Sequence, residues 1–194
     1  EIAWLYNIRG KDIPYNPVVI SYALVSAERA WLFVKPAKIP AEVKQALEEA
    51  GVEIRDYHHL FLFLEEWKDK KKFCLDTSTL NFAVYNKIAA SHEIITGRSP
   101  VVLWKALKNP TEIAGFRKAC QQDGIAMTRF FYWLEQQVGK RTISETEAAE
   151  KLTALRKENP DYISDSFHTI SAYGPNAALP HYSAVPGKDT LLQP

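Results

Sequence analysis

Residues 167–183 read FHTISAYGPNAALPHYS, two short runs of extended character on either side of a chain reversal. The Gly-Pro-Asn sequence at 174–176 supplies the backbone freedom and the preset φ angle that a turn needs. The flanking residues are β-branched or aromatic, as in short strands. The stretch therefore predicts a β-hairpin that carries His181 and Tyr182 on its return strand.

The composition is that of an ordinary globular protein. The 194 residues are 46% hydrophobic and 24% charged, and 24 Lys and Arg stand against 23 Asp and Glu, for a net charge of +1. This balance gives no overall attraction to nucleic acid or to an anionic membrane. No apolar run reaches the length of a membrane span. We therefore expect a cytoplasmic protein with neither kind of partner, in which Cys74 and Cys120 are buried, reduced thiols.

The first half of the chain is predicted to alternate strands and helices. Short apolar runs rich in β-formers are expected as strands at 4–8, 17–25, 30–34, 52–55, 73–75 and 93–96. Helical patterns lie between them, at 40–50, 56–67 and 79–88. This alternation is typical of an α/β layer built on a mixed sheet. Three histidines, His58, His59 and His92, are expected at its surface.

The pattern changes near residue 108. Asn109-Pro110-Thr111-Glu112 combines an N-cap residue, a proline at the first helical position and a carboxylate in the first turn. Apolar residues then recur at steps of three and four from Ile113 to Val138, which predicts a long helix with a buried stripe. Residues 144–147 have the capping-box pattern of a second helix. We place the domain boundary at 105–109, which gives domains 1–107 and 108–194.

Few residue patterns point to catalysis by themselves. No histidine has an acidic or histidine partner at metal-ligand spacing, and the HExxH, GxSxG and GxxxxGK[ST] motifs are absent. Ser171, His181 and Asp165 could form a hydrolytic triad, but nothing in their spacing favours one. His181 is the candidate functional residue. The alternative is a structural histidine that bonds a neighbouring carbonyl.

Three groups of residues resemble the Xaa-Pro aminopeptidases (aminopeptidase P) of the creatinase and prolidase superfamily. The first group is WLYNIRGKD at 4–12 with Asn16-Pro17 and Ser21-Tyr22-Ala23. The second is NPTEI at 109–113 with Phe116-Arg117, and the third is FHTIS at 167–171 with GPNA at 174–177 and His181-Tyr182. The groups span nearly the whole chain in the family's order. Residues 177–180, AALP, depart from the glycine and aliphatic residues usual there.

The resemblance implies a mixed α/β domain like the N-terminal domain of creatinase, followed by the first helix-helix-hairpin portion of a pita-bread catalytic domain. It implies an enzyme that uses two divalent metal ions, typically manganese, to remove the residue before a proline in the second position of a peptide. His181 matches the family's catalytic, substrate-binding histidine, and Tyr182 and Asn176 are the neighbouring candidates for substrate binding. Arg9 and Asp12 are candidates for the active site, for a homodimer interface, or for a structural salt bridge.

The resemblance also implies that these residues belong to a longer protein, as the abrupt ends and the missing initiator methionine suggest. The family's metal ligands lie downstream of the His-Tyr motif, so we expect residues 1–194 alone to bind no catalytic metal and to be inactive. Two alternatives stay open. One is a prolidase-like or creatinase-like enzyme, and the other is a non-catalytic pita-bread binding module like those of histone chaperones and growth-regulatory proteins.

Overall fold

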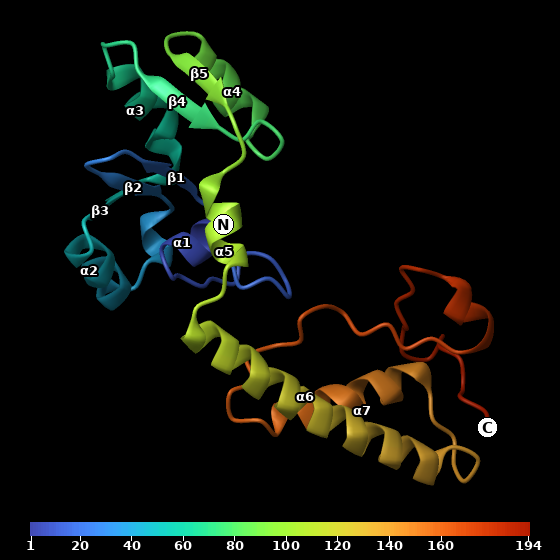
Figure 1. The fold of residues 1–194 in the computed structure, drawn as a ribbon. Coiled ribbons are helices and arrows are strands. Elements are labelled where there is room, and N and C mark those ends of the chain that lie inside the picture. Colours follow the sequence, from blue (N-terminus) through green and yellow to red (C-terminus); the bar gives the residue numbers. More distant parts are fainter. The chain divides into compact units, whose positions relative to one another are not determined.

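The computed structural model describes residues 1–194, and the chain forms two compact units, Glu1–Leu107 and Lys108–Pro194 (Figure 1). The first unit mixes strands and helices, and the second is built on two helices followed by a long irregular segment. None of the helices combines the length and the hydropathy needed to span a membrane.

The first unit contains two small sheets. The larger has the strand order β1 (Tyr22–Val25), β2 (Ala30–Phe33) and β3 (Val52–Arg55). In it β1 and β2 run antiparallel and β2 and β3 parallel. The second sheet pairs β4 (Lys72–Leu75) with β5 (Glu93–Thr96) in parallel. The mixed pairing confirms the predicted α/β class, although the strands form two sheets.

Short helices connect these strands. They are α1 (Ile2–Leu5), α2 (Ala41–Glu49), α3 (Leu60–Glu66), α4 (Phe82–Ala89) and α5 (Pro100–Ala106), with 3₁₀ turns at Pro36–Lys38 and Tyr57–His59. Local signals explain their ends: Gly51 has φ +80° just after α2, and the Asp56 side chain accepts a hydrogen bond of 2.8 Å from the His58 N–H. The predicted strand at 4–8 is wrong, because α1 occupies its start. There the Leu5 N–H donates to the Glu1 carbonyl within one turn.

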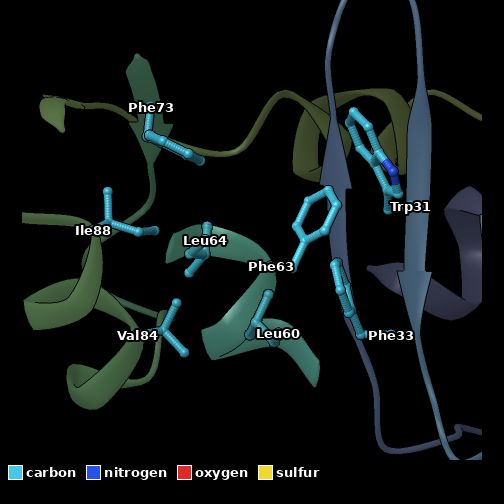
Figure 2. Close-up of a cluster of buried hydrophobic side chains, with 8 residues drawn as sticks. All are labelled: Trp31, Phe33, Leu60, Phe63, Leu64, Phe73, Val84 and Ile88. Atoms are coloured by element: carbon cyan, nitrogen blue, oxygen red, sulfur yellow. The ribbon is translucent and has the colours of Figure 1, made fainter. Parts of the chain in front are cut away.

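The core of this unit lies on both sides of β2. Successive strand residues point to opposite faces, so Phe33 joins one buried cluster and Leu32 the other. In the first cluster, the Phe33 and Phe63 rings lie 5.3 Å apart, and α4 and β4 close the far side (Figure 2). Burial on both faces accounts for the near-continuous apolar run of this strand.

For three residues, the exposure to solvent predicted from the sequence is wrong. His92 is 6% exposed, with its Nε2 3.4 Å from the Leu64 carbonyl oxygen and its ring against Phe73, whereas a surface position was expected. Conversely, Cys74 and Cys120 are exposed. Burial of a single residue depends on what the other elements bring to it, so a local pattern predicts it poorly.

The second unit begins with two helices that lie side by side, α6 (Pro110–Gln137) and α7 (Glu145–Lys157) (Figure 1). The predicted start of α6 is confirmed, because Asn109 and Glu112 exchange two capping hydrogen bonds of 2.9 Å each. Ser144 likewise caps α7 by accepting from the Glu147 N–H at 3.2 Å.

The apolar stripe predicted for α6 is mostly uncovered. Phe116 and Phe131 are 58% and 53% exposed, and only Ala126 is buried. The helix has 28 residues and its neighbour α7 has 13, so α7 covers only part of it. On α7 itself Ala148, Leu152 and Leu155 are buried as predicted.

The predicted hairpin at 167–183 is also wrong. No strand forms there, and Gly174–Ala178 is instead a 3₁₀ helix. Its first residue, Gly174, has φ +57°. The two flanks meet at a side-chain contact of 2.7 Å between Ser183 Oγ and His168 Nε2. The Tyr173 N–H, which a ladder would need, donates to the Glu145 carboxylate.

Candidate functional site

A buried carboxylate organises the segment that carries the His-Tyr motif. Glu145, in the first turn of α7, is 0% exposed. It accepts hydrogen bonds from the Tyr182 hydroxyl at 2.7 Å, from the Thr190 N–H at 3.0 Å and from the Tyr173 N–H at 2.5 Å. The Asn176 amide nitrogen lies 3.2 Å from both of its oxygens. One side chain therefore joins three stretches of the irregular segment to the start of α7.

These contacts set the ionisation of the groups that make them. Burial by itself raises the pKa of Glu145, but the donors from Tyr182, Thr190, Tyr173 and Asn176 together outweigh it, so the pKa is lowered. In return, the hydrogen bond to this carboxylate and its negative charge raise the pKa of Tyr182 to about 12. At neutral pH the site therefore holds an ionised carboxylate and a neutral phenol.

A second carboxylate ties the far end of the segment to the same helix. Asp189 accepts a hydrogen bond of 2.8 Å from the Thr146 N–H, in the first turn of α7. Hydrogen bonds from Ser144 and Thr146 hold the pKa of Asp189 well below its usual range. Negative charge is favoured at the N-terminal end of a helix, where backbone N–H groups lack partners within the helix. The segment is thus anchored on both sides of the His-Tyr motif.

His181 lies just outside this network. It precedes Tyr182, is exposed, and its imidazole has no hydrogen-bond partner within the chain. The structure therefore brings together two of the three site residues predicted in the second unit, Asn176 and Tyr182, which also bond each other at 3.1 Å. The third, His181, stays outside the network and exposed. The alternative of a histidine bonded to a neighbouring carbonyl is not found.

The triad considered from the sequence is not assembled. Asp165 accepts a hydrogen bond of 2.8 Å from Thr153 Oγ1 and lies 4.0 Å from Arg156, with no histidine beside it. Neither Ser171 nor His181 bonds it. Ser171, His181 and Asp165 therefore do not form a catalytic triad.

In the first unit, Arg9 and Asp12 take structural positions. Arg9 donates 2.9 Å hydrogen bonds to the carbonyls of Ala3 and Ile8. Asp12 pairs with Lys38 at 2.6 Å and accepts from the Ile20 N–H at 2.7 Å. These bonds lower the pKa of Asp12, the contact with Lys38 most of all. Within this chain Asp12 makes a salt bridge with Lys38 and Arg9 bonds backbone carbonyls, so the two residues do not pair with each other.

The acidic, histidine and cysteine side chains of this chain do not gather into a metal-binding cluster. Residues 1–194 contain no group of three or more His, Cys, Asp or Glu side chains placed to hold an ion. The carboxylate of Glu145 is instead fully engaged with neutral donors. The residues present therefore do not fit a metal centre.

Two family models together match nearly the whole chain. A family model described as the creatinase/prolidase N-terminal domain matches residues 1–112, more than half of the chain. The chain belongs to the creatinase/prolidase family. A second family model, metallopeptidase family M24, matches residues 114–194, so the two matches meet close to the boundary between the compact units.

Curated relatives in this family share well over a third of the residues. Proteins named "Probable Xaa-Pro aminopeptidase P" from Sordaria macrospora and Botryotinia fuckeliana are each 40% identical over 205 residues, and the match covers 100% of this chain. It covers 33% and 31% of the relatives. The chain therefore spans about a third of the length of the curated relatives it matches.

Solved structures agree with the fold. The X-prolyl aminopeptidase of Caenorhabditis elegans, described as a cytosolic enzyme with a di-nuclear active site, superposes with a TM-score of 0.90 at 31% identity over 99% of this chain and 32% of that one. The Xaa-Pro dipeptidase of Bacillus anthracis superposes with a TM-score of 0.68 at 21% identity, over 98% of this chain and 50% of that one. The second likeness supports the fold alone.

Glu145 and Asp189 were not predicted from the sequence as parts of this site. A signal for Glu145 was present: it stands three residues before Ala148 on the stripe that continues through Leu152 and Leu155. A carboxylate in line with a buried stripe is expected to meet hydrogen-bond donors. No local pattern distinguishes Asp189 from other acidic residues in loops.

Proposed function

We propose that residues 1–194 are part of a metal-dependent Xaa-Pro aminopeptidase, which removes the N-terminal residue that precedes a proline in a peptide. The observation that carries the proposal is the match of the entire chain, at 40% identity, to proteins named for that activity. The proline of such a substrate has a fixed ring and no amide hydrogen, so a specific pocket is needed to accept it. In this proposal 1–107 is the middle domain and 108–194 the first part of the catalytic domain.

The role proposed for this chain is to present His181 to the substrate. An imidazole beside the scissile bond can donate a hydrogen bond to the oxygen on which negative charge develops. Its exposure and lack of partners within the chain leave both ring nitrogens available. Tyr182 and Asn176, fixed on Glu145, would shape the backbone on either side and contribute to substrate binding.

Two divalent metal ions are part of the proposal for the longer protein, in line with the M24 match and the di-nuclear site of the nematode enzyme. Manganese is our prediction for their identity. Since residues 1–194 do not fit a metal centre, their ligands would come from elsewhere in the polypeptide, and no step through the metals is derived from these residues. A cytoplasmic location and a homodimer are further predictions.

The test uses the longest natural polypeptide that contains these residues, assayed with added Mn²⁺ on an Arg-Pro-Pro type peptide and on the same peptide with alanine in the second position. We expect cleavage of the proline peptide only. His181→Ala should lower kcat/KM by about 10²–10³-fold, the usual cost of losing one such donor. His59→Ala, which removes another exposed histidine, is the matched control and should change nothing.

Other outcomes would decide between the alternatives. Cleavage confined to dipeptides indicates a prolidase-like enzyme. A folded wild-type polypeptide with no turnover under any divalent metal contradicts the proposal and favours a binding module. Turnover that survives His181→Ala unchanged would leave the activity in place and remove the role of this histidine.

A further inference from the structure

A groove of about 680 Å³ separates the two sheets of the first unit. Its walls are formed by all four residues of β1 on one side and all four of β4 on the other. Each of these strands is the last of its own sheet, with no partner on the side of the groove. Two sheet edges thus line one opening, beside the cluster of core residues drawn in Figure 2.

The backbone of β1 directs unpaired groups into this space. The Ser26 N–H donates to the Arg29 carbonyl at 2.8 Å, which makes those two residues a hydrogen-bonded pair across the turn. Since hydrogen-bonded and non-hydrogen-bonded pairs alternate along antiparallel strands, Leu24 bonds β2, whereas the N–H and C=O groups of Ala23 and Val25 point away from it.

The backbone of β4 does the same from the opposite side. The N–H groups of Glu93 and Gly97 donate to the carbonyls of Lys71 and Leu75. In a parallel pair, alternate residues of a strand direct their backbone groups toward the partner strand. Lys71, Phe73 and Leu75 therefore bond β5, and the N–H and C=O groups of Lys72 and Cys74 face the groove. Both edges therefore offer alternate donors and acceptors of the kind that one inserted strand would satisfy together.

Several apolar side chains around the groove are incompletely covered. Leu24, Trp67 and Leu80 line it and are only partly buried, although they pack against the core cluster. An extended segment with apolar residues at alternate positions would cover them with one face. Because they pack directly against the core, their cover has to be permanent. A transiently bound peptide would leave the core open whenever it dissociated.

We propose that the groove is the place of one further β-strand, which pairs with β1 and β4 at once and joins the two sheets into one. We assign it to a segment of the same polypeptide outside residues 1–194, because the matched relatives are about three times as long as this chain and a covalently linked strand meets the need for permanent cover. This inference concerns the first unit alone and stands whether or not the protein is a peptidase.

Hydrogen exchange at single amides tests the proposal. The amides of Ala23, Val25, Lys72 and Cys74 are compared in the 194-residue chain and in the longest natural polypeptide that contains it. We expect exchange at these four sites to be at least about a hundredfold slower in the longer polypeptide. The amides of Phe73 and Leu75, which point toward β5, are the internal control and should be protected in both.

Three results would overturn the inference. The four amides could exchange equally fast in both polypeptides, which means that no strand is inserted. They could be protected in the short chain in proportion to its dimerisation in analytical ultracentrifugation, which assigns the groove to a second copy. They could be protected in the monomeric short chain, which means that β1 and β4 pair directly.

A substitution gives a second readout. Ala23→Pro removes an N–H that has no partner in the 194-residue chain, and proline is tolerated on an edge strand. We expect an unchanged melting temperature in the short chain and a decrease of about 4–8 °C for this unit in the longer polypeptide, from the loss of one ladder bond. Equal effects in the two polypeptides would contradict an inserted strand.

Discussion

Substitution of Glu145 by glutamine should loosen the whole segment that carries His181. The variant keeps the size of the side chain, removes its charge and turns one acceptor oxygen into a donor. The hydrogen bonds from Tyr182, Thr190 and Tyr173 are all made to the carboxylate of a fully buried residue. A hydrogen bond to a charged group contributes about 1.5–3 kcal/mol, and a buried donor left without an acceptor costs about 1–3 kcal/mol.

If one or two of these donors lose their acceptor, the free energy of unfolding of the second unit should fall by about 2–4 kcal/mol. The assay is urea unfolding of the 194-residue chain together with hydrogen exchange at the Tyr173 and Thr190 amides. Those amides should lose their protection first. The matched control is Glu147→Gln, on the same helix, whose exposed pair with Arg141 should contribute less than about 1 kcal/mol.

The same substitution should change the dependence of stability on pH. The pKa of Glu145 is lower in the folded state than in the unfolded chain, so its contribution is fully present above the unfolded value of about 4.3 and is lost as the pH falls through the folded value. Wild type should therefore lose stability more steeply than Glu145→Gln on acidification below about pH 4. Equal stability of the two proteins at pH 7, with both amides still protected, would refute the role given to this carboxylate.

Three further perturbations test other parts of the structure. The difference in ultraviolet absorbance between wild type and Tyr182→Phe should show a phenol that ionises near pH 12, and a normal value near 10 would contradict its bond to Glu145. Gly10→Ala places a Cβ 2.7 Å from the Val18 carbonyl oxygen and should destabilise the first unit by about 1–3 kcal/mol. Gly115→Ala, which has open space around it in α6, should instead stabilise its helix by about 0.5–1 kcal/mol. Thermal unfolding distinguishes the two variants, and equal effects would refute the close approach at Gly10. In urea unfolding, Phe33→Ala should lower the free energy of unfolding by about 3–5 kcal/mol. Phe82→Ala, at a residue that is 74% exposed, should lower it by about 0.5 kcal/mol or less. A small effect at position 33 would mean that the cluster of Figure 2 is not the core.

Signals that act within one turn of the chain predicted the helix ends well. The capping residues Asn109 and Ser144 and the proline at the start of α6 all lie where the sequence placed them. The motifs that resemble aminopeptidase P were sufficient to predict the family, which the family models confirm. These features depend on residue identity and short spacing, both of which the sequence contains in full.

Contacts between residues far apart in the chain decided the features that local patterns did not predict. The turn at 174–176 was predicted correctly as a reversal, but a hairpin also needs a ladder, and Glu145 takes the donor of Tyr173 from 28 positions earlier in the chain. The stripe on α6 was visible in the sequence, whereas its exposure follows from the shorter length of α7. The sequence alone determined where helices start and which family the chain joins, because those depend on local chemistry. Only the tertiary structure decided which carboxylate is buried, which stripe is covered and which sheet edges stay unpaired, because burial and pairing are properties of segments that meet in space.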